Sequence, residues 1–172
     1  MKDNKRDGMV VYDKHVAFWG GAFSNFYPCK LRVDEKEYIS SEQYFMVQKA
    51  IHFGDDEMLE KIMNSKTPKE AKAFGRQVKN FDSEEWDKVC EERMYEGVLA
   101  KFSQNEDLRD FILSDEFKGK GFVEGSPIDG VWGVKIHYES PNIDDETQWN
   151  GKNLLGKVLD RVRDELSHLK SR

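Results

Sequence analysis

The sequence predicts a mainly helical single domain with short strands near the N-terminus and in the centre of the chain. Capping residues precede several stretches with apolar residues at helical spacing, and short β-branched and aromatic runs are concentrated in the N-terminal part. A chain of 172 residues is also long enough to bury one sizeable core. We expect a disordered N-terminus over residues 1–9 and a single domain over residues 10–168.

Composition and charge exclude several functional classes. Charged residues make up 35% of the chain, and no run approaches the roughly 18 apolar residues that span a membrane. The opening MKDNKRDG lacks the apolar centre of a signal peptide, which predicts a cytoplasmic protein without membrane contact. The net charge of -6 argues against a broad surface for duplex nucleic acid, but it allows a small anionic substrate.

Residues that commonly hold metals or cofactors are sparse. Cys29 and Cys90 are far apart and form no C-x-x-C pair, so we expect free thiols. The histidines are scattered, and the usual phosphate-cradling, zinc-protease and serine-hydrolase motifs are absent. The sequence therefore predicts no metal site and no cofactor.

Strands are predicted on both sides of a long helical segment, and a polar loop precedes the end of the chain. The loop, residues 137–152, has a length typical of lids, binding loops or local disorder. The expected strands are residues 9–12 (MVVY), 16–20 (VAFWG), a hairpin over 30–40, 122–125 (FVEG) and 131–136 (VWGVKI).

Helices are predicted from capping residues and apolar spacing. Ser40 and Gln43 form a capping box, Thr67 and Pro68 begin another helix, and Gly75 is the expected C-terminal stop of that helix. The helix over residues 83–102 is expected to be the longest. The predicted ranges are 40–53, 55–64, 67–75, 83–102, 105–113 and 153–166.

Glu42 and Lys49 stand out in the segment SSEQYFMVQKA. They are two helical turns apart, so both side chains share one stripe with Phe45 and Met46, with their backbones about 10 Å apart. If the stripe faces a pocket, desolvation makes Lys49 a better nucleophile, and Glu42 can exchange protons with a substrate. The alternative is a solvated helix face, which is the usual position of charged residues.

The segment AFSNFYP, residues 22–28, alternates small polar residues with aromatic ones. Ser24, Asn25 and Phe26 in such a loop present hydrogen-bonding groups beside a stacking surface, which is typical of a binding loop. A tight turn whose aromatic residues pack in the core explains the same residue types. The residues alone leave both interpretations open.

The segment FVEGSPIDGVWG, residues 122–133, contains two acidic residues and a tryptophan. Glu124 lies on a short apolar strand, where a carboxylate is unusual. Asp129 and Trp132 lie among turn-forming residues, and turn chemistry explains Asp129 as well as catalysis does. All three are candidates for the chemistry of a site.

Two further segments are candidate anion sites. Asn153 in WNGKNLLG precedes a helix whose first amides favour a phosphate, although a plain N-cap explains the same residues. Lys72 and Arg76 in AKAFGR are placed either to meet a phosphate or to stabilise the C-terminal end of their own helix.

The order of six short motifs resembles the NADAR family. They are FSNFYP, SSEQYFMVQKA, AKAFGR, VLAKFSQN, VEGSPIDGVWG and GKNLLGKVLDRVR, and the resemblance covers nearly the whole chain. That family includes N-glycosidases acting on phosphorylated riboflavin-pathway intermediates and hydrolases that remove ADP-ribose from guanine. The resemblance implies a compact α+β domain, mainly helical, that cleaves an N-glycosidic bond without a metal.

The resemblance also suggests roles for individual residues. We expect Lys49 to be the nucleophile, Glu42 or Glu124 to act as acid and base, and Asp129 to orient the ribose hydroxyls. Trp132 is expected to stack on the base. The predicted substrate-binding residues are Ser24, Asn25, Phe26, Arg76, Trp132, Gly133, Lys152 and Asn153.

Two mechanisms fit these residues. A ribose attached through an exocyclic amine can open to an imine, and Lys49 can then form a Schiff base at that carbon. A two-carboxylate mechanism with an oxocarbenium-like transition state is the rival. The expected substrate is either ADP-ribose on guanine, including ADP-ribosylated DNA, or a phosphorylated ribosylamino-pyrimidine of the riboflavin pathway. The loop over residues 137–148 is longer than in compact family members, which leaves this choice open.

Two other functional classes compete with an enzyme. A non-catalytic module that binds ADP-ribose or a nucleotide would keep Trp132 but would need neither Glu42 nor Lys49. A protein that stacks bases of single-stranded nucleic acid would bind in a strongly salt-dependent way, and the acidic net charge argues against it. We expect a hydrolase acting on N-glycosyl bonds, with no obligate protein partner.

Overall fold

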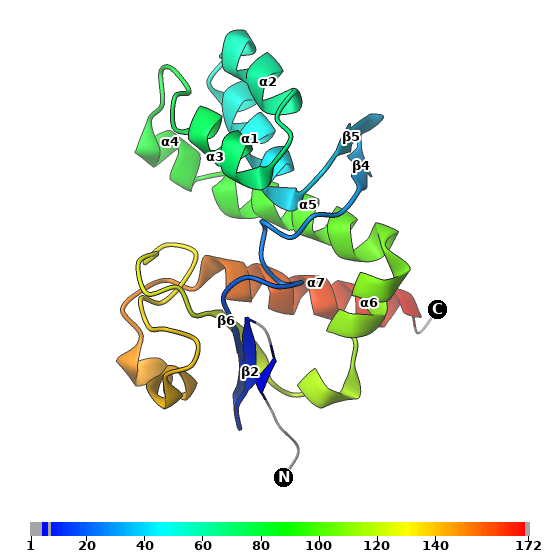
Figure 1. The fold of residues 1–172 in the computed structure, drawn as a ribbon, viewed down its shortest axis with the longest axis vertical. Coiled ribbons are helices and arrows are strands. Elements are labelled where there is room, and N and C mark those ends of the chain that lie inside the picture. The colour runs from blue at the N-terminus through cyan, green and yellow to red at the C-terminus, as the bar shows by residue number, and fades with distance from the viewer. Residues whose placement is uncertain (1–4, 7, 171–172) are drawn as a thin grey trace. The chain divides into compact units, whose positions relative to one another are not determined.

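The computed structural model describes residues 5–6 and 8–170, which group into two compact units (Figure 1). The first unit contains the N-terminal residues up to Ser24 and the chain from Asp107 onward, and the second contains Asn25–Glu106. In sequence, the second unit is therefore an insertion between two neighbouring strands of the first.

The first unit is built on a four-stranded sheet in the order β1-β2-β3-β6. β1 (Lys5–Arg6), β2 (Met9–Val11) and β3 (His15–Phe18) are antiparallel neighbours, and β6 (Gly121–Glu124) runs parallel to β3. All side chains of β3 are buried, as expected of a strand that is covered on both faces. Because β3 and β6 are parallel, Glu124 lies where the carboxyl ends of both strands meet.

The two faces of this sheet are covered by different parts of the unit. α7 (Leu154–Lys170) packs along β6, where the Arg163 guanidinium lies 4.5 Å from the centre of the Phe122 ring. Successive side chains of a strand point to opposite faces. The neighbouring Val123 accordingly packs against residues of the polar loop, in a cluster with Ala17, Val134 and Ile143. The remaining elements are α6 (Glu106–Ile112) and the 3-10 helices η1 (Asp115–Phe117), η2 (Pro141–Asp144) and η3 (Glu146–Gln148).

The second unit is a group of helices with a β-hairpin. α1 packs against α2, α3 and α5, and the hairpin packs against α5 (Figure 1). Asp34 and Glu35 form the hairpin turn and both have positive φ, as two-residue turns commonly require. The elements are β4 (Leu31–Val33), β5 (Lys36–Tyr38), α1 (Ser41–His52), α2 (Asp56–Met63), α3 (Pro68–Gly75), α4 (Ser83–Asp87) and α5 (Cys90–Gln104).

Ser40 and Thr67 cap their helices as predicted, and Asp55 caps a third helix. Each accepts a hydrogen bond at 3.1 Å from the backbone amide three residues further on. The predicted mainly helical α+β fold class is confirmed, whereas the predicted domain bounds stay a prediction. No helix within the described ranges is long and apolar enough to cross a membrane.

The predicted long helix over residues 83–102 is wrong in its bounds. The chain leaves the helical conformation at Val89, which has φ of -125°, so α4 and α5 are separate helices. Asp82, not Ser83, caps α4, because its carboxylate accepts hydrogen bonds from the amides of Glu84 and Glu85. α7, with 17 residues, is longer than α5, with 15.

The predicted strand over residues 131–136 does not form. Lys135 has φ of 56°, which interrupts an extended conformation. The carbonyls of Val131 and Trp132 instead accept hydrogen bonds from the amides of Leu154 and Leu155 at 3.2 Å. This segment therefore caps the start of α7 rather than joining the sheet.

α3 ends at Gly75, where the sequence predicted the helix to stop. A Cβ at this position would be only 2.0 Å from the Met46 Sδ. Its role is close packing between α1 and α3. Within the segment expected to be disordered, residues 1–4 and 7 lie outside the described residues, while Lys5–Arg6 form β1 and Met9 begins β2.

Candidate active site

In the second unit, the start of α1 is held by a dense set of hydrogen bonds. Ser40 caps the helix, and the Gln43 Oε1 accepts a hydrogen bond from the Ile39 amide at 2.8 Å. The Ser41 hydroxyl donates to the Asn25 side-chain oxygen at 2.9 Å, and the Glu42 amide donates to the Asn25 carbonyl at 3.1 Å. The backbone of Glu42 is therefore fixed from both sides.

Asn25 is buried, and its side chain is engaged inside the second unit. Its amide nitrogen lies 3.2 Å from the Met94 sulfur, in addition to the contact with Ser41. Phe26, by contrast, is 40% exposed. The sequence left open whether this loop binds ligand or packs in the core, and Asn25 packs while Phe26 faces outward.

Glu42 and Lys49 are not on a solvated helix face. Glu42 is only 7% exposed, and Lys49 is partly buried. The pKa of Lys49 is lowered from its ordinary value, mainly because burial disfavours the ammonium form. The positive charge of Arg76 lowers it further, while the negative charge of Glu42 opposes the change. A lysine in this environment supplies the free amine more readily than an exposed one.

Arg76 approaches Lys49 because α3 packs on α1. Ala71 and Gly75 form the buried side of α3, and Arg76 follows as its exposed C-cap residue. Lys72, one turn earlier, lies 5.5 Å from the centre of the Phe26 ring. We call Glu42, Lys49 and Arg76 the lysine cluster. It combines an amine, a carboxylate and a permanent cation within one unit.

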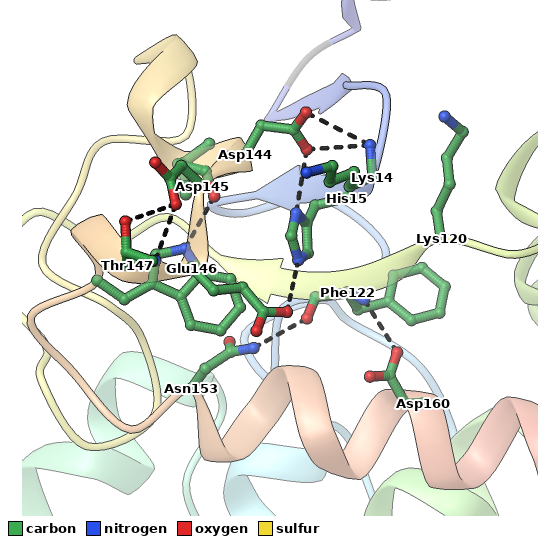
Figure 2. Close-up of polar contacts among 12 residues, drawn as sticks. Lys14, His15, Lys120, Phe122, Asp144, Asp145, Glu146, Thr147, Asn153 and Asp160 are labelled. Atoms are coloured by element: carbon green, nitrogen blue, oxygen red, sulfur yellow. Dashed lines mark hydrogen bonds and ion pairs between the residues drawn. The ribbon is translucent and has the colours of Figure 1, made fainter.

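In the first unit, Glu124 ends β6 and is fixed by Asn153. The Glu124 amide donates to the Asn153 side-chain oxygen at 3.0 Å. The Asn153 side-chain nitrogen donates to the Phe122 carbonyl at 3.0 Å (Figure 2). Asn153 is 3% exposed and has φ of 53°. The Asn153 side chain thus bonds to the backbone of β6 on two residues, as a neighbouring strand would. The sequence had instead predicted that it contacts substrate.

Asp129 closes its own turn. Its Oδ1 accepts hydrogen bonds from the amides of Val131 and Trp132, both at 2.9 Å. Gly133 follows in a crowded position, where a Cβ would be 2.8 Å from the Glu124 carbonyl. The turn interpretation of Asp129 is therefore supported by geometry, and a role toward ribose would fall to its second oxygen.

The start of α7 has little capacity for an anion. The amides of Lys152, Asn153 and Leu154 donate to the carbonyls of residues 130, 133 and 131, respectively. The Lys152 side chain is exposed. Since backbone carbonyls already bond to these amides, the structure does not favour phosphate binding at this helix end.

The polar loop is an ordered cover of the sheet. The His15 Nδ1 lies 3.0 Å from Asp144, and its Nε2 lies 3.2 Å from Glu146 (Figure 2). The Trp149 ring meets His15 edge to face at 5.2 Å and donates its indole N–H to the Ile143 carbonyl at 2.8 Å. One buried histidine therefore fastens both 3-10 helices of the loop to β3.

The described residues contain no group of three or more histidine, cysteine or acidic side chains placed to hold a metal ion. The thiols of Cys29 and Cys90 are both free, and burial is the main cause that raises the pKa of each.

Sequence patterns missed three residues around these sites. Phe81 lies over Lys49, Asp55 holds the segment that carries Phe81, and His15 anchors the polar loop. No spacing rule connects these residues with their partners, because each partner is distant in sequence. In the sequence, the local signal beside Phe81 is Asn80, a residue type common in turns, and its φ in the structure is positive.

The fold defines an α+β class of protein, and its second unit holds a partly buried lysine under the electrostatic influence of Glu42 and Arg76. The family model of the NADAR domain matches residues 14–167 of this chain. The chain is 39% identical over 166 residues to "N-glycosidase R617" of Acanthamoeba polyphaga mimivirus, covering 89% of this chain and 96% of that protein. It is 32% identical to "N-glycosidase YbiA" of Escherichia coli, with 92% of each chain covered.

A solved structure agrees with these relatives. The NMR structure of the E. coli protein YbiA superposes with a TM-score of 0.75 and 30% sequence identity, over 98% of this chain and 94% of that chain. The chain belongs to the NADAR family, as its motifs predicted.

Proposed function

We propose that the protein is an N-glycosidase that hydrolyses an N-ribosyl bond through a Schiff base on Lys49. The names of its relatives support the coarser statement that it is a hydrolase of N-glycosyl bonds. The observation that carries the finer statement is the environment of Lys49, a partly buried amine with a lowered pKa beside Glu42 and Arg76. A module that only binds would not need this environment.

The proposed reaction begins with a ribose joined to an exocyclic amine, whose ring opens to an imine at C1. The neutral Lys49 amine adds to C1 of the imine. The base nitrogen takes one proton from the Lys49 nitrogen and a second from Glu42, and the bond from C1 to the base nitrogen then breaks. This releases the base as an amine and leaves a protonated Schiff base between C1 and the Lys49 nitrogen. Water then adds to C1, Glu42 recovers a proton, and the free sugar and the lysine separate.

Glu42 is the preferred acid and base because it is within electrostatic reach of Lys49 in the same unit. Glu124, Asp129 and Trp132 keep their proposed roles as second carboxylate, ribose ligand and base-stacking residue. Arg76 is the proposed phosphate ligand, since a guanidinium binds phosphate in a bidentate way and remains charged. Ser24, Phe26, Gly133 and Lys152 remain proposed substrate contacts.

The proposed substrate is ADP-ribose on guanine, in a nucleotide or in DNA, or a phosphorylated ribosylamino-pyrimidine. Both carry a ribose on nitrogen and at least one phosphate. A cytoplasmic location is part of the proposal, because these substrates arise inside cells.

The test is to incubate the protein with both substrate classes and to detect a released base or sugar by mass spectrometry. The parent protein is expected to release product from one class, and Lys49→Ala is expected to release none. Lys61→Ala, which changes an exposed lysine on α2, is the matched control and should keep full activity. Release by Lys49→Ala at the parent rate would contradict the Schiff-base route.

A further inference from the structure

Phe81 is an exposed aromatic residue that covers the candidate nucleophile. Its ring is 46% exposed, yet the Lys49 Nζ lies only 4.4 Å from the ring centre. At this distance the electron-rich face of a ring attracts an ammonium group. The ring therefore contacts the amine on one side and solvent on the other.

The segment that carries Phe81 is built to hold the ring in place. The buried Asp55 caps α2 through the Met58 amide at 3.1 Å, and its second oxygen accepts a hydrogen bond from the Lys79 amide at 2.8 Å. These bonds lower the pKa of Asp55, so the carboxylate remains charged at neutral pH. Asn80, with φ of 62°, then turns the chain toward Lys49.

Phe81 also has an aromatic support behind it. Its ring meets Phe53 edge to face at 5.4 Å, and Phe53 lies 6.1 Å from the buried Trp86. Phe53 itself is the C-cap residue of α1, the helix that bears Lys49. The amine and the ring that covers it are thus fixed to the same helix.

We propose that Phe81 is a positioning residue for Lys49, holding the amine in a fixed place before substrate enters and leaving its own outer face for the aglycone. This inference rests on the proposed function for the role of Lys49, but the contact itself is independent of any substrate. Physically, the ring stabilises the ammonium form, and it therefore offsets part of the effect of burial. An aliphatic side chain of similar size would cover the amine without this attraction.

The test measures the protonation of Lys49 directly. The rate of acylation by acetic anhydride is followed against pH by peptide mass spectrometry, with the exposed Lys61 in the same chain as the internal reference. Phe81→Leu keeps the cover and removes the aromatic face, so the labelling midpoint of Lys49 should fall by about half a pH unit. Phe81→Tyr keeps the face and should retain the parent midpoint.

An unchanged or raised midpoint in Phe81→Leu would overturn the proposal. This readout does not depend on turnover, so it separates the two ideas. If the labelling shift occurs but no substrate is cleaved, only the proposed function fails. If the parent cleaves substrate but the midpoint of Phe81→Leu does not fall, only the positioning role fails.

Discussion

Glu42 illustrates how burial changes the use of one residue. On an exposed helix face Glu42 would be one of many solvated acids. Here it is 7% exposed, and its negative charge raises the pKa of Lys49. Glu42→Gln removes the charge but keeps the shape of the side chain. We expect turnover to fall by about 10²–10⁴-fold, which is the usual contribution of a positioned acid or base.

The same variant should lower the labelling midpoint of Lys49, because the opposing negative charge is gone. Glu91→Gln on α5, where the side chain is exposed, is the control and should change neither quantity. Full activity in Glu42→Gln would transfer the acid and base role to another carboxylate, and Glu124→Gln would then be the variant to measure.

Lys101 makes a separate prediction about stability and pH. It is 1% exposed, and burial lowers the pKa of its amine to about 8. Since the unfolded amine titrates near its ordinary value of 10.5, the unfolded chain binds more protons between these two pH values. This residue therefore contributes stability that increases as pH rises from about 8 to about 10.5.

Lys101→Met removes that titration. From pH 7 to pH 10, the free energy of unfolding of the parent should therefore rise by on the order of 2–3 kcal/mol relative to that of the variant. The measurement is urea unfolding of both proteins at the two pH values. The parent-minus-variant difference in the free energy of unfolding at pH 7 is compared with the same difference at pH 10. An equal gap at both pH values would show that the folded and unfolded amines titrate alike.

At the scale of elements, the polar loop depends on one strand residue. The loop covers the sheet through Ile143, and His15 binds its two 3-10 helices through Asp144 and Glu146. In His15→Gln, the glutamine side chain can reproduce at most part of the two contacts that His15 makes with Asp144 and Glu146. Hydrogen–deuterium exchange in residues 138–150 should rise, while exchange in α1 should stay as in the parent.

His168→Gln is the matched control, because His168 is an exposed histidine on α7. It should leave exchange in the loop unchanged. Unaltered protection of the loop in His15→Gln would mean that the apolar contacts of Ile143 and Trp149 are sufficient to hold it.

The junction of β6 and α7 is equally specific. A Cβ on Gly156 would lie 2.1 Å from the Phe122 carbonyl and 2.3 Å from the Asn153 side-chain nitrogen. Gly156→Ala should therefore destabilise the protein by roughly 1–3 kcal/mol or more, through overpacking against backbone that cannot move freely. Thermal unfolding checks this, with Glu165→Ala on the exposed side of α7 as the control. An equal melting temperature in both variants would contradict the packing argument.

At the scale of the whole molecule, local patterns predicted more of the fold than of the site. Capping residues and apolar spacing located most helices, because the information for a helix start lies within a few residues. The strand predicted over residues 131–136 failed because its carbonyls are used by α7, about twenty residues later in the chain. No local window contains that competition.

In the candidate site, too, the sequence showed relations within one segment but not contacts between distant segments. Glu42 and Lys49 are on one helix, so their relation was visible in the spacing of the sequence. The contact between Phe81 and Lys49 depends on how Asp55 turns a distant segment, and it could not be read from either segment alone. Likewise, nothing near Asn153 in the sequence indicates that its side chain binds the backbone of β6.

The central claim is that Lys49 forms a covalent bond to the sugar, and borohydride trapping tests it most directly. The protein is incubated with a cleavable ribosylated substrate, reduced with sodium borohydride and digested, and the Lys49 peptide is analysed by mass spectrometry. We predict a sugar adduct on Lys49 in the parent protein. The adduct should be absent without substrate, and it should be absent or strongly reduced in Glu42→Gln. A protein that cleaves its substrate at the normal rate but never yields this adduct would contradict the account, and it would favour the two-carboxylate mechanism.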